Sequence, residues 1–336
     1  MRISVLDQSP LVSGGTPADA LRNTIDLARH ADRLGYHRYW VAGHHSMVSH
    51  GSPAPEILVG RLAMETSGIR VGSGGVLLSL YQPLKVAEVF RTLHVLYPDR
   101  VDLGIGRSPG GLPLAAKALG QQRLPTEAEF QAKLGDLLGF LLGFPPEHEF
   151  ADVDVMPSSP GAPPVWLLGS STQSALMAAA NGLPYSYAHF INPGGTVEAI
   201  TAYRSSFRPS VYASSPQVIL GIGVYCAETS AEAQRIFATQ RLFRRWAVEN
   251  HLSRLPSPAE ALEALTTGAD PLADEHFPWP RYAVGAPDEV HAQISAMASS
   301  LEVDEVIAMA SIHDHKARVR SYELLAEVFR LPAMKF

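Results

Sequence analysis

The chain has 336 residues, of which 46% are hydrophobic and 18% are charged, and its formal net charge is −6. This length allows two small domains or one large α/β barrel, and the low charged fraction is typical of strands buried on both faces. The acidic balance without a basic cluster argues against a nucleic-acid partner. Cys226 is the only cysteine, so a disulfide within the chain is excluded.

The sequence predicts neither a membrane span nor a secretion signal. The longest apolar run, 137–144, has eight residues and contains two glycines, which is too short to cross a bilayer. Asp7 interrupts the first apolar run too early for a signal peptide. We therefore expect a cytoplasmic enzyme without a membrane partner.

Short apolar runs alternate with helical patterns along the whole chain. The predicted strands are 3–6, 39–42, 69–73, 101–105, 165–168, 185–188, 218–225 and 305–309. Helical segments begin near residues 17, 56, 83, 126, 171, 196, 230 and 287, and a last helix ends near 329. Apolar residues in these segments recur at spacings of three and four, as on the buried face of a helix.

Strict alternation of eight strand–helix units predicts a parallel sheet closed into a (β/α)8 TIM barrel, with residues 1–336 as one domain. An open doubly wound sheet is the alternative, because several of the predicted strands are short. Residues 251–282 interrupt the alternation, so we expect an insertion at the C-terminal face of the barrel that forms a lid.

The segment from Val165 to His189 contains the parts of an anion-binding site. A strand ends at Gly169, Ser170 and Ser171 can cap the following helix, and Ser174 lies within its first turn. Free backbone N–H groups and the positive end of the helix dipole favour a phosphate at such a turn. Serine caps are common without any ligand, so the segment alone leaves both interpretations open.

In a barrel, the residues that follow the strands gather at the C-terminal mouth, where barrel enzymes carry their chemistry. These residues are Asp7, His44, His45, Gly74, Gly75, Gly106, Arg107, Ser170, Ser171, His189, His313 and His315. The sequence contains no HExxH zinc motif, P-loop or GxSxG elbow. The pair His313 and His315 lacks further ligands at other strand ends, so we expect no metal site.

Several segments together resemble the bacterial luciferase-like, flavin-dependent monooxygenases. They are WVAGHH (40–45), IRVGSGGVLL (69–78), QPLKVAEVFRTLHVLYPDRVDLGIGRSPGG (82–111), LGSSTQSALMAAANGLPYSYAHF (168–190) and RSYELLAE (320–327). The resemblance extends from residue 3 to about 331 and is to the single-chain branch of the family. It implies a (β/α)8 barrel that binds FMN at its mouth, and a homodimer.

The resemblance also implies roles for individual residues. It assigns the FMN phosphate to Ser170, Ser171, Ser174 and Arg107, and a guanidinium suits phosphate because it offers a fork of donors. It assigns Gly74 and Gly75 to the flavin ring, as a pair often joined by a cis peptide in the family. His44 corresponds to the active-site histidine, which can exchange a proton near neutral pH. We assign His45, Tyr81 and His189 to the substrate side of the pocket.

Three departures from the family pattern stand out. Gly43 replaces the glutamate of the frequent Glu-His-His sequence, Tyr81 lies where small polar residues are common, and Gly106 replaces the cysteine of light-emitting members. The loss of the glutamate raises the possibility of a flavin-binding protein without turnover.

The implied activity is that of a two-component monooxygenase. A separate flavin reductase would supply reduced FMN, O₂ would add at the flavin C4a position, and a small apolar or aromatic substrate would be oxygenated. The alternatives are a deazaflavin-dependent hydride-transfer oxidoreductase, a non-catalytic flavin-binding protein and, ranked last, a sugar-phosphate barrel enzyme.

Overall fold

A computed structural model describes residues 1–333 except 109, 124, 159, 268–271 and 273–274. Its strands are β1 (Arg2–Asp7), β2 (Arg38–Val41), β3 (Arg70–Leu77), β4 (Val101–Gly106), β5 (Val165–Gly169), β6 (Tyr185–Ala188), β7 (Val218–Cys226), β8 (Tyr282–Gly285) and β9 (Glu305–Met309). Its helices are α1 (Pro17–Arg33), α2 (Pro55–Glu65), α3 (Pro83–Leu96), α4 (Pro113–Ala118), α5 (Glu127–Leu142), α6 (Thr172–Ala180), α7 (Thr196–Ser206), α8 (Ser230–Val248), α9 (Pro258–Leu265), α10 (Pro287–Ser300) and α11 (His315–Val328).

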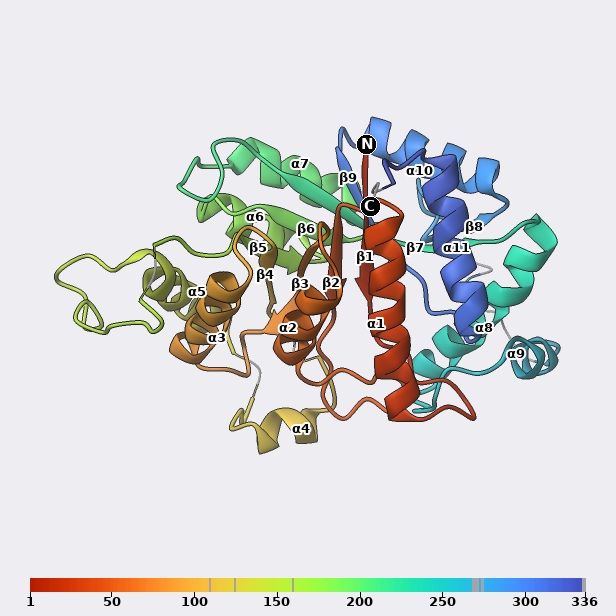
Figure 1. The fold of residues 1–336 in the computed structure, drawn as a ribbon, viewed down its shortest axis with the longest axis horizontal. Helices are drawn as coiled ribbons and strands as arrows, with labels where there is room; N and C mark the ends of the chain where they lie inside the picture. The colour runs from red at the N-terminus through yellow and green to blue at the C-terminus, as the bar shows by residue number, and fades with distance from the viewer. Residues whose placement is uncertain (109, 124, 159, 268–271, 273–274, 334–336) are drawn as a thin grey trace.

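Eight strands close into a parallel barrel. Strands β1 to β7 pair in sequence order, and β9 closes the ring by pairing with both β7 and β1. The helices lie outside the ring (Figure 1). The buried faces of all helices except α4 and α9 form one continuous core with the strands, and the buried residues of α4 and α9 lie in two smaller clusters. The predicted (β/α)8 fold is confirmed, and the eight ring strands are those that the sequence predicts.

The ninth strand, β8, was not predicted from the sequence. It pairs only with the end of β7, from Gly223 to Cys226, where β7 extends beyond its pairing with β9. It begins at Tyr282, the last residue of the predicted insertion. Helix α9 lies within the same insertion and packs on α8. None of the helices in the described parts of the chain is long and apolar enough to cross a membrane.

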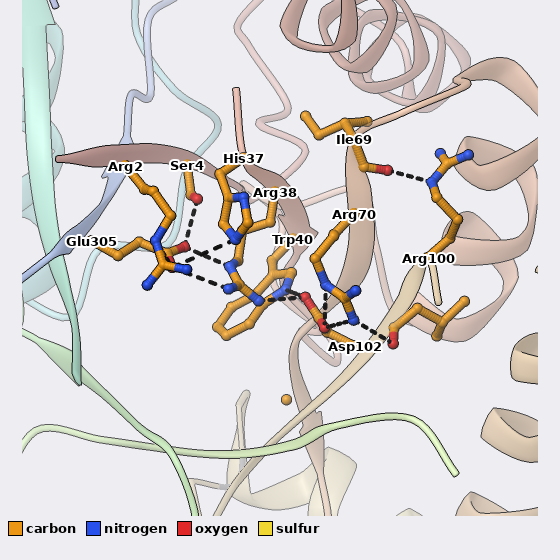
Figure 2. Close-up of polar contacts among 12 residues, drawn as sticks. Arg2, Ser4, His37, Arg38, Trp40, Ile69, Arg70, Arg100, Asp102 and Glu305 are labelled. Carbon is orange, nitrogen blue, oxygen red and sulfur yellow. Dashed lines mark hydrogen bonds and ion pairs between the residues drawn. The ribbon is translucent and has the colours of Figure 1, made fainter. Parts of the chain in front are cut away.

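Buried charges fill the N-terminal end of the barrel, as Figure 2 shows. The carboxylate of Asp102 accepts hydrogen bonds from Arg38 at 2.6 Å, from Arg70 at 2.6 Å and from the indole N–H of Trp40 at 3.0 Å. Glu305 binds the other edge of the Arg38 guanidinium. We call Arg38, Arg70, Asp102 and Glu305 the floor cluster. The carboxylates and guanidinium groups of the floor cluster thus pair with one another at the starts of the strands, at the end opposite the mouth.

Candidate active site

A cavity of about 630 Å³ opens at the C-terminal ends of the strands. Every strand of the ring contributes a residue to its wall: Leu6, Trp40, Gly74, Gly106, Leu168, Ser186, Gly221 and Ile307. The volume is within the usual range for small-molecule sites. The wall is largely apolar, so the few polar groups that reach the cavity determine what it can bind.

The first turn of α6 forms one polar part of this wall. Ser171 is the N-cap: its side chain accepts from the backbone N–H of Ser174 at 3.3 Å, and the Ser174 hydroxyl donates to the Ser171 carbonyl at 2.7 Å. A Cβ atom on Gly169 would lie 2.0 Å from the Ser174 hydroxyl, so only glycine leaves room for this turn. Ser170, Ser171 and Ser174 all line the cavity. The structure therefore brings the predicted phosphate-binding serines together.

A second helix N-terminus reaches the same rim. Thr126 caps α5, and both Thr126 and Glu127 line the cavity. The amide of Gln173, in the first turn of α6, donates to the Glu127 carboxylate. Arg107 also lines the cavity, and within the described residues its guanidinium makes no ion pair. We call Arg107, Ser170, Ser171 and Ser174 the anion rim, because helix N-termini and a free guanidinium favour a bound anion.

Three glycines give the cavity a flat side. The peptide bond between Gly74 and Gly75 is cis. A Cβ atom on Gly74 would lie 2.6 Å from Leu6, and one on Gly75 would lie 2.8 Å from the carbonyl of Gly104. A Cβ atom on Gly106 would meet nothing closer than 4.0 Å and would project into free space. The surrounding atoms therefore leave no room for a side chain at Gly74 or Gly75, and backbone forms this part of the cavity wall.

His44 brings an imidazole to the cavity from the loop after β2. Its Nδ1 atom is buried and has no hydrogen-bond partner among the described residues. Burial, with a smaller contribution from neighbouring His45, lowers the pKa of His44 from 6.5 to about 4. The ring is therefore neutral at physiological pH, and it can accept a proton or a hydrogen bond from a ligand.

The comparisons with known proteins decide the family. The luciferase-like monooxygenase model matches residues 1–305. The chain belongs to the luciferase-like monooxygenase family. It is 40% identical to the uncharacterized protein YceB of Bacillus subtilis, over 98% of this chain and 99% of that protein. It is 33% identical to the N-acetyl-S-alkylcysteine monooxygenase of the same organism, over 97% of this chain and 98% of that protein.

Solved structures of known proteins share the fold of this chain. The crystal structure of apo-MsnO8 has 50% sequence identity and a TM-score of 0.94, and the match covers 99% of both chains. A type II Baeyer–Villiger monooxygenase of Pseudomonas putida in complex with FMN has 18% identity and a TM-score of 0.71, over 100% of this chain and 99% of that one. An F420-dependent secondary alcohol dehydrogenase has 16% identity and a TM-score of 0.66, over 97% and 98%. At such identities the two distant structures show the fold alone.

The glutamate that the family resemblance predicts at position 43 would make tight contacts in this backbone. A Cβ atom on Gly43 would lie 3.1 Å from the Pro55 ring and 3.3 Å from the carbonyl of Gly75. Neighbouring atoms would have to give way to any larger side chain. A side chain at position 43 would therefore require the Pro55 ring and the Gly75 carbonyl to move by a few tenths of an ångström.

The three residues assigned to the substrate side do not line the cavity. His45 forms a hydrogen bond with the Tyr81 hydroxyl, and its backbone N–H donates to the carbonyl of Gly110 at 2.9 Å. The pair thus joins two loops beside the mouth. His189 is fully buried, with Nδ1 2.7 Å from the Thr196 hydroxyl and Nε2 2.9 Å from the Pro280 carbonyl. Since a carbonyl only accepts, Nε2 carries the proton of His189.

The predicted insertion touches the wall of the cavity. Arg281 donates to the carbonyls of Phe190 and Ile191, at 2.9 and 2.7 Å, and both of these residues line the cavity. Arg281 is held in turn by an ion pair with Glu275. The end of the segment 251–282 is thus attached to the loop after β6, and its role as a lid stays a prediction.

Sequence reasoning missed several residues of the cavity. They are Gln8, Trp40, Phe190, Ile191, Glu127 and Gln173. A signal existed for Glu127, because the Thr-x-x-Glu pattern at 126–129 is typical of a helix N-terminus.

Among the described residues, no group of three or more His, Cys, Asp or Glu side chains could hold a metal ion. His315 instead pairs with Asp26 at 2.8 Å.

Proposed function

We propose that this protein is the oxygenating component of a two-component system. It would receive reduced FMN from a separate cytoplasmic flavin reductase and use O₂ to oxygenate a small apolar or aromatic molecule. The observation that supports this most directly is the shape of the site. An anion rim, a flat glycine surface and a buried neutral imidazole lie along one apolar cavity.

The residues present fit an FMN-sized group. The anion rim offers a guanidinium, hydroxyls and helix N–H groups to a phosphate, and the flat surface at Gly74, Gly75 and Gly106 leaves space for a ring. The unpartnered Nδ1 atom of His44 is a buried polar group in the same wall. Such a group is rare in a finished core, and it is expected where a ligand completes the site.

Each part of the site has a distinct task in this proposal. Bound reduced flavin supplies the electrons that activate O₂, so that one oxygen atom enters the substrate and the other leaves as water. Arg107, Ser171 and Ser174 hold the phosphate and fix the register of the cofactor. His44 accepts or returns a proton at the cavity surface. Leu6, Leu77 and Phe190 exclude water from the reaction.

An anaerobic titration with chemically reduced FMN tests the proposal. We expect binding at micromolar concentration or tighter, weaker binding of riboflavin, and a loss of this preference for FMN in Arg107→Ala. Addition of O₂ and a substrate panel should then give O₂ consumption and a product heavier by one oxygen atom. Hydride exchange with a deazaflavin but no binding of FMN would instead favour the deazaflavin-dependent alternative. Tight FMN binding without any turnover would favour a non-catalytic flavin-binding protein.

We also propose that the protein is a homodimer through the outer faces of α2 and α3. These adjacent helices expose Ile57 (71%), Met64 (70%) and Leu96 (61%). Large exposed apolar side chains on adjacent helices are typical of an interaction surface. Light scattering should give a dimer for the native chain and a monomer for the double variant Ile57→Glu with Met64→Glu. Leu114→Glu on α4, where the native leucine is 76% exposed, should stay dimeric.

A further inference from the structure

The loop after β2 contains a second histidine, His50, that lies next to His44. The backbone N–H of Leu11 donates to Ser49, and that of Gly51 donates to Ser9, both at 2.8 Å. These bonds fix His50 against the segment that follows β1, where it forms an isolated bridge with Pro10. The position of His50 is therefore set by the backbone.

The His50 ring packs against the ring of His44 in a tilted arrangement. Their centroids are 4.2 Å apart and their planes are inclined by 32°. The edge of Phe243, from α8, approaches the same His50 ring at a centroid distance of 6.4 Å. A hydrogen bond of 2.8 Å joins His50 Nδ1 to the Ser49 hydroxyl. His50 itself does not line the cavity.

Among the described residues, no hydrogen bond orients the His44 ring. Its Nδ1 atom is buried. Catalytic histidines are commonly oriented by a carboxylate or a carbonyl bonded to the second ring nitrogen. The position next to His44 in the chain is Gly43, where a side chain would meet Pro55 and the carbonyl of Gly75. The ring face of His50 is thus the aromatic contact that remains.

We propose that His50 is a positioning residue for His44: its packed imidazole holds the His44 ring at the cavity wall and keeps water from the buried side of that ring. The inference rests on the proposed role of His44 in the reaction. His50 takes over, by ring packing, the orientation that a carboxylate would supply by hydrogen bonding.

The electrostatics of the pair agree with this arrangement. Burial lowers the pKa of His50 to about 3, with a further decrease from His44, while Asp7 acts in the opposite direction. The other nearby titratable groups are His45, which lowers the pKa of His44, and Arg318, which pairs with Asp7. Both rings are therefore neutral from about pH 5 upward. His44 then presents a neutral imidazole to the cavity.

The experiment is an NMR titration of the His44 ring in the flavin-free protein. His50→Ala and His50→Gln both remove the packed ring and admit water, so the pKa of His44 should rise from about 4 toward 6.5. His50→Phe retains a ring on the same face and should keep the pKa of His44 low. If His50→Ala fails to fold, the contrast between the Gln and Phe variants carries the test.

A matched control is available in the same chain. His148 stacks on Phe144 at the same centroid distance, 4.2 Å, but lies in the connection between α5 and β5 and does not line the cavity. His148→Ala should leave the titration of His44 unchanged. The proposal is overturned if His50→Ala and His50→Gln leave the pKa of His44 at its native value, or if His148→Ala shifts it equally.

This readout is independent of the proposed function. The titration uses no flavin, so failure of FMN to bind would leave the positioning of His44 by His50 intact. Conversely, FMN binding with an unshifted His44 in the His50 variants would retain the monooxygenase proposal and reject the positioning role.

Discussion

The two ends of the barrel use polar groups in opposite ways. At the floor, Arg38 is almost fully buried, yet its guanidinium is bonded to both Asp102 and Glu305. At the mouth, His44 has a buried nitrogen without a partner, and Arg107 makes no ion pair among the described residues. The floor satisfies its polar groups internally, whereas the mouth leaves some of them free.

This difference separates stability from binding. A buried charge that loses its partner destabilises the fold, so changes at the floor should act on unfolding. A polar group without a protein partner makes no hydrogen bond or ion pair whose loss would destabilise the fold. Changes at the mouth should therefore act on ligand affinity. Variants at the floor should therefore change the free energy of unfolding, and variants at the mouth should change the ligand affinity.

The largest effect is expected at the floor, from Asp102→Asn. The carboxylate accepts from Arg38, Arg70 and Trp40, so its loss leaves buried guanidinium charge poorly compensated. We expect a loss of about 3–5 kcal/mol in the free energy of unfolding, measured by urea denaturation. The exposed pair Arg235–Glu232 is the control, because Arg235→Gln should cost about 1 kcal/mol or less. A loss that small for Asp102→Asn as well would contradict the role of the floor.

The second effect is at the mouth, from Ser171→Ala combined with Ser174→Ala. Each hydroxyl bonded to a charged phosphate contributes about 1.5–3 kcal/mol, so FMN affinity should fall roughly a hundredfold or more. Ser174 contributes the smaller share, because its hydroxyl already donates to the Ser171 carbonyl. Calorimetric titration measures the change. Ser257→Ala removes the N-cap of α9 and should leave FMN affinity unchanged; equal affinities in all variants would place the phosphate elsewhere.

Two glycines on β4 give the same contrast within a single strand. A Cβ atom on Gly104 would lie 2.1 Å from the carbonyl of Ser73, and one on Gly106 would meet only the carbonyl of Leu168, at 4.0 Å. Gly104→Ala should therefore destabilise the fold by about 1–3 kcal/mol or more. Gly106→Ala should change stability by about 0.5 kcal/mol at most and weaken FMN binding. Thermal unfolding with an FMN titration distinguishes them, and equal unfolding temperatures would refute the contrast.

The barrel and part of its mouth could be predicted from local patterns. Each ring strand is an apolar run followed by a helical period, and the Ser171 cap depends on residues within four positions of one another. The floor cluster could not be predicted in this way, because Arg38 meets Asp102 and Glu305 across sequence separations of 64 and 267 residues. No local sequence pattern indicates which of the isolated charged residues in the eight strands will form ion pairs with one another.

The predicted histidines show where strand-end reasoning fails. His44 and His45 are adjacent, and only His44 lines the cavity, because neighbouring residues in extended chain point to opposite sides. His189 likewise follows Ala188, which lines the cavity, while its own ring is buried behind the wall. Strand β8 escaped prediction for a different reason. Its four residues pair only with the overhang of β7, a length that the alternation of units does not fix.

The last effect is a change in the pH dependence of stability, which is absent at neutral pH and is provided by His189. Burial lowers the pKa of His189 from 6.5 to about 4. Between pH 6.5 and pH 4, His189 is therefore protonated in the unfolded chain but neutral in the folded chain. The contribution of His189 is complete above pH 6.5 and is lost as pH falls toward 4, by about 1.4 kcal/mol per pH unit at most. His189→Gln, in which the amide can still donate to Pro280, should make the decline in unfolding free energy between pH 6.5 and 4 shallower. Urea denaturation at several pH values measures both slopes. Parallel slopes would show that His189 is as free to protonate in the folded chain as in the unfolded chain, which would contradict the effect of burial on its pKa.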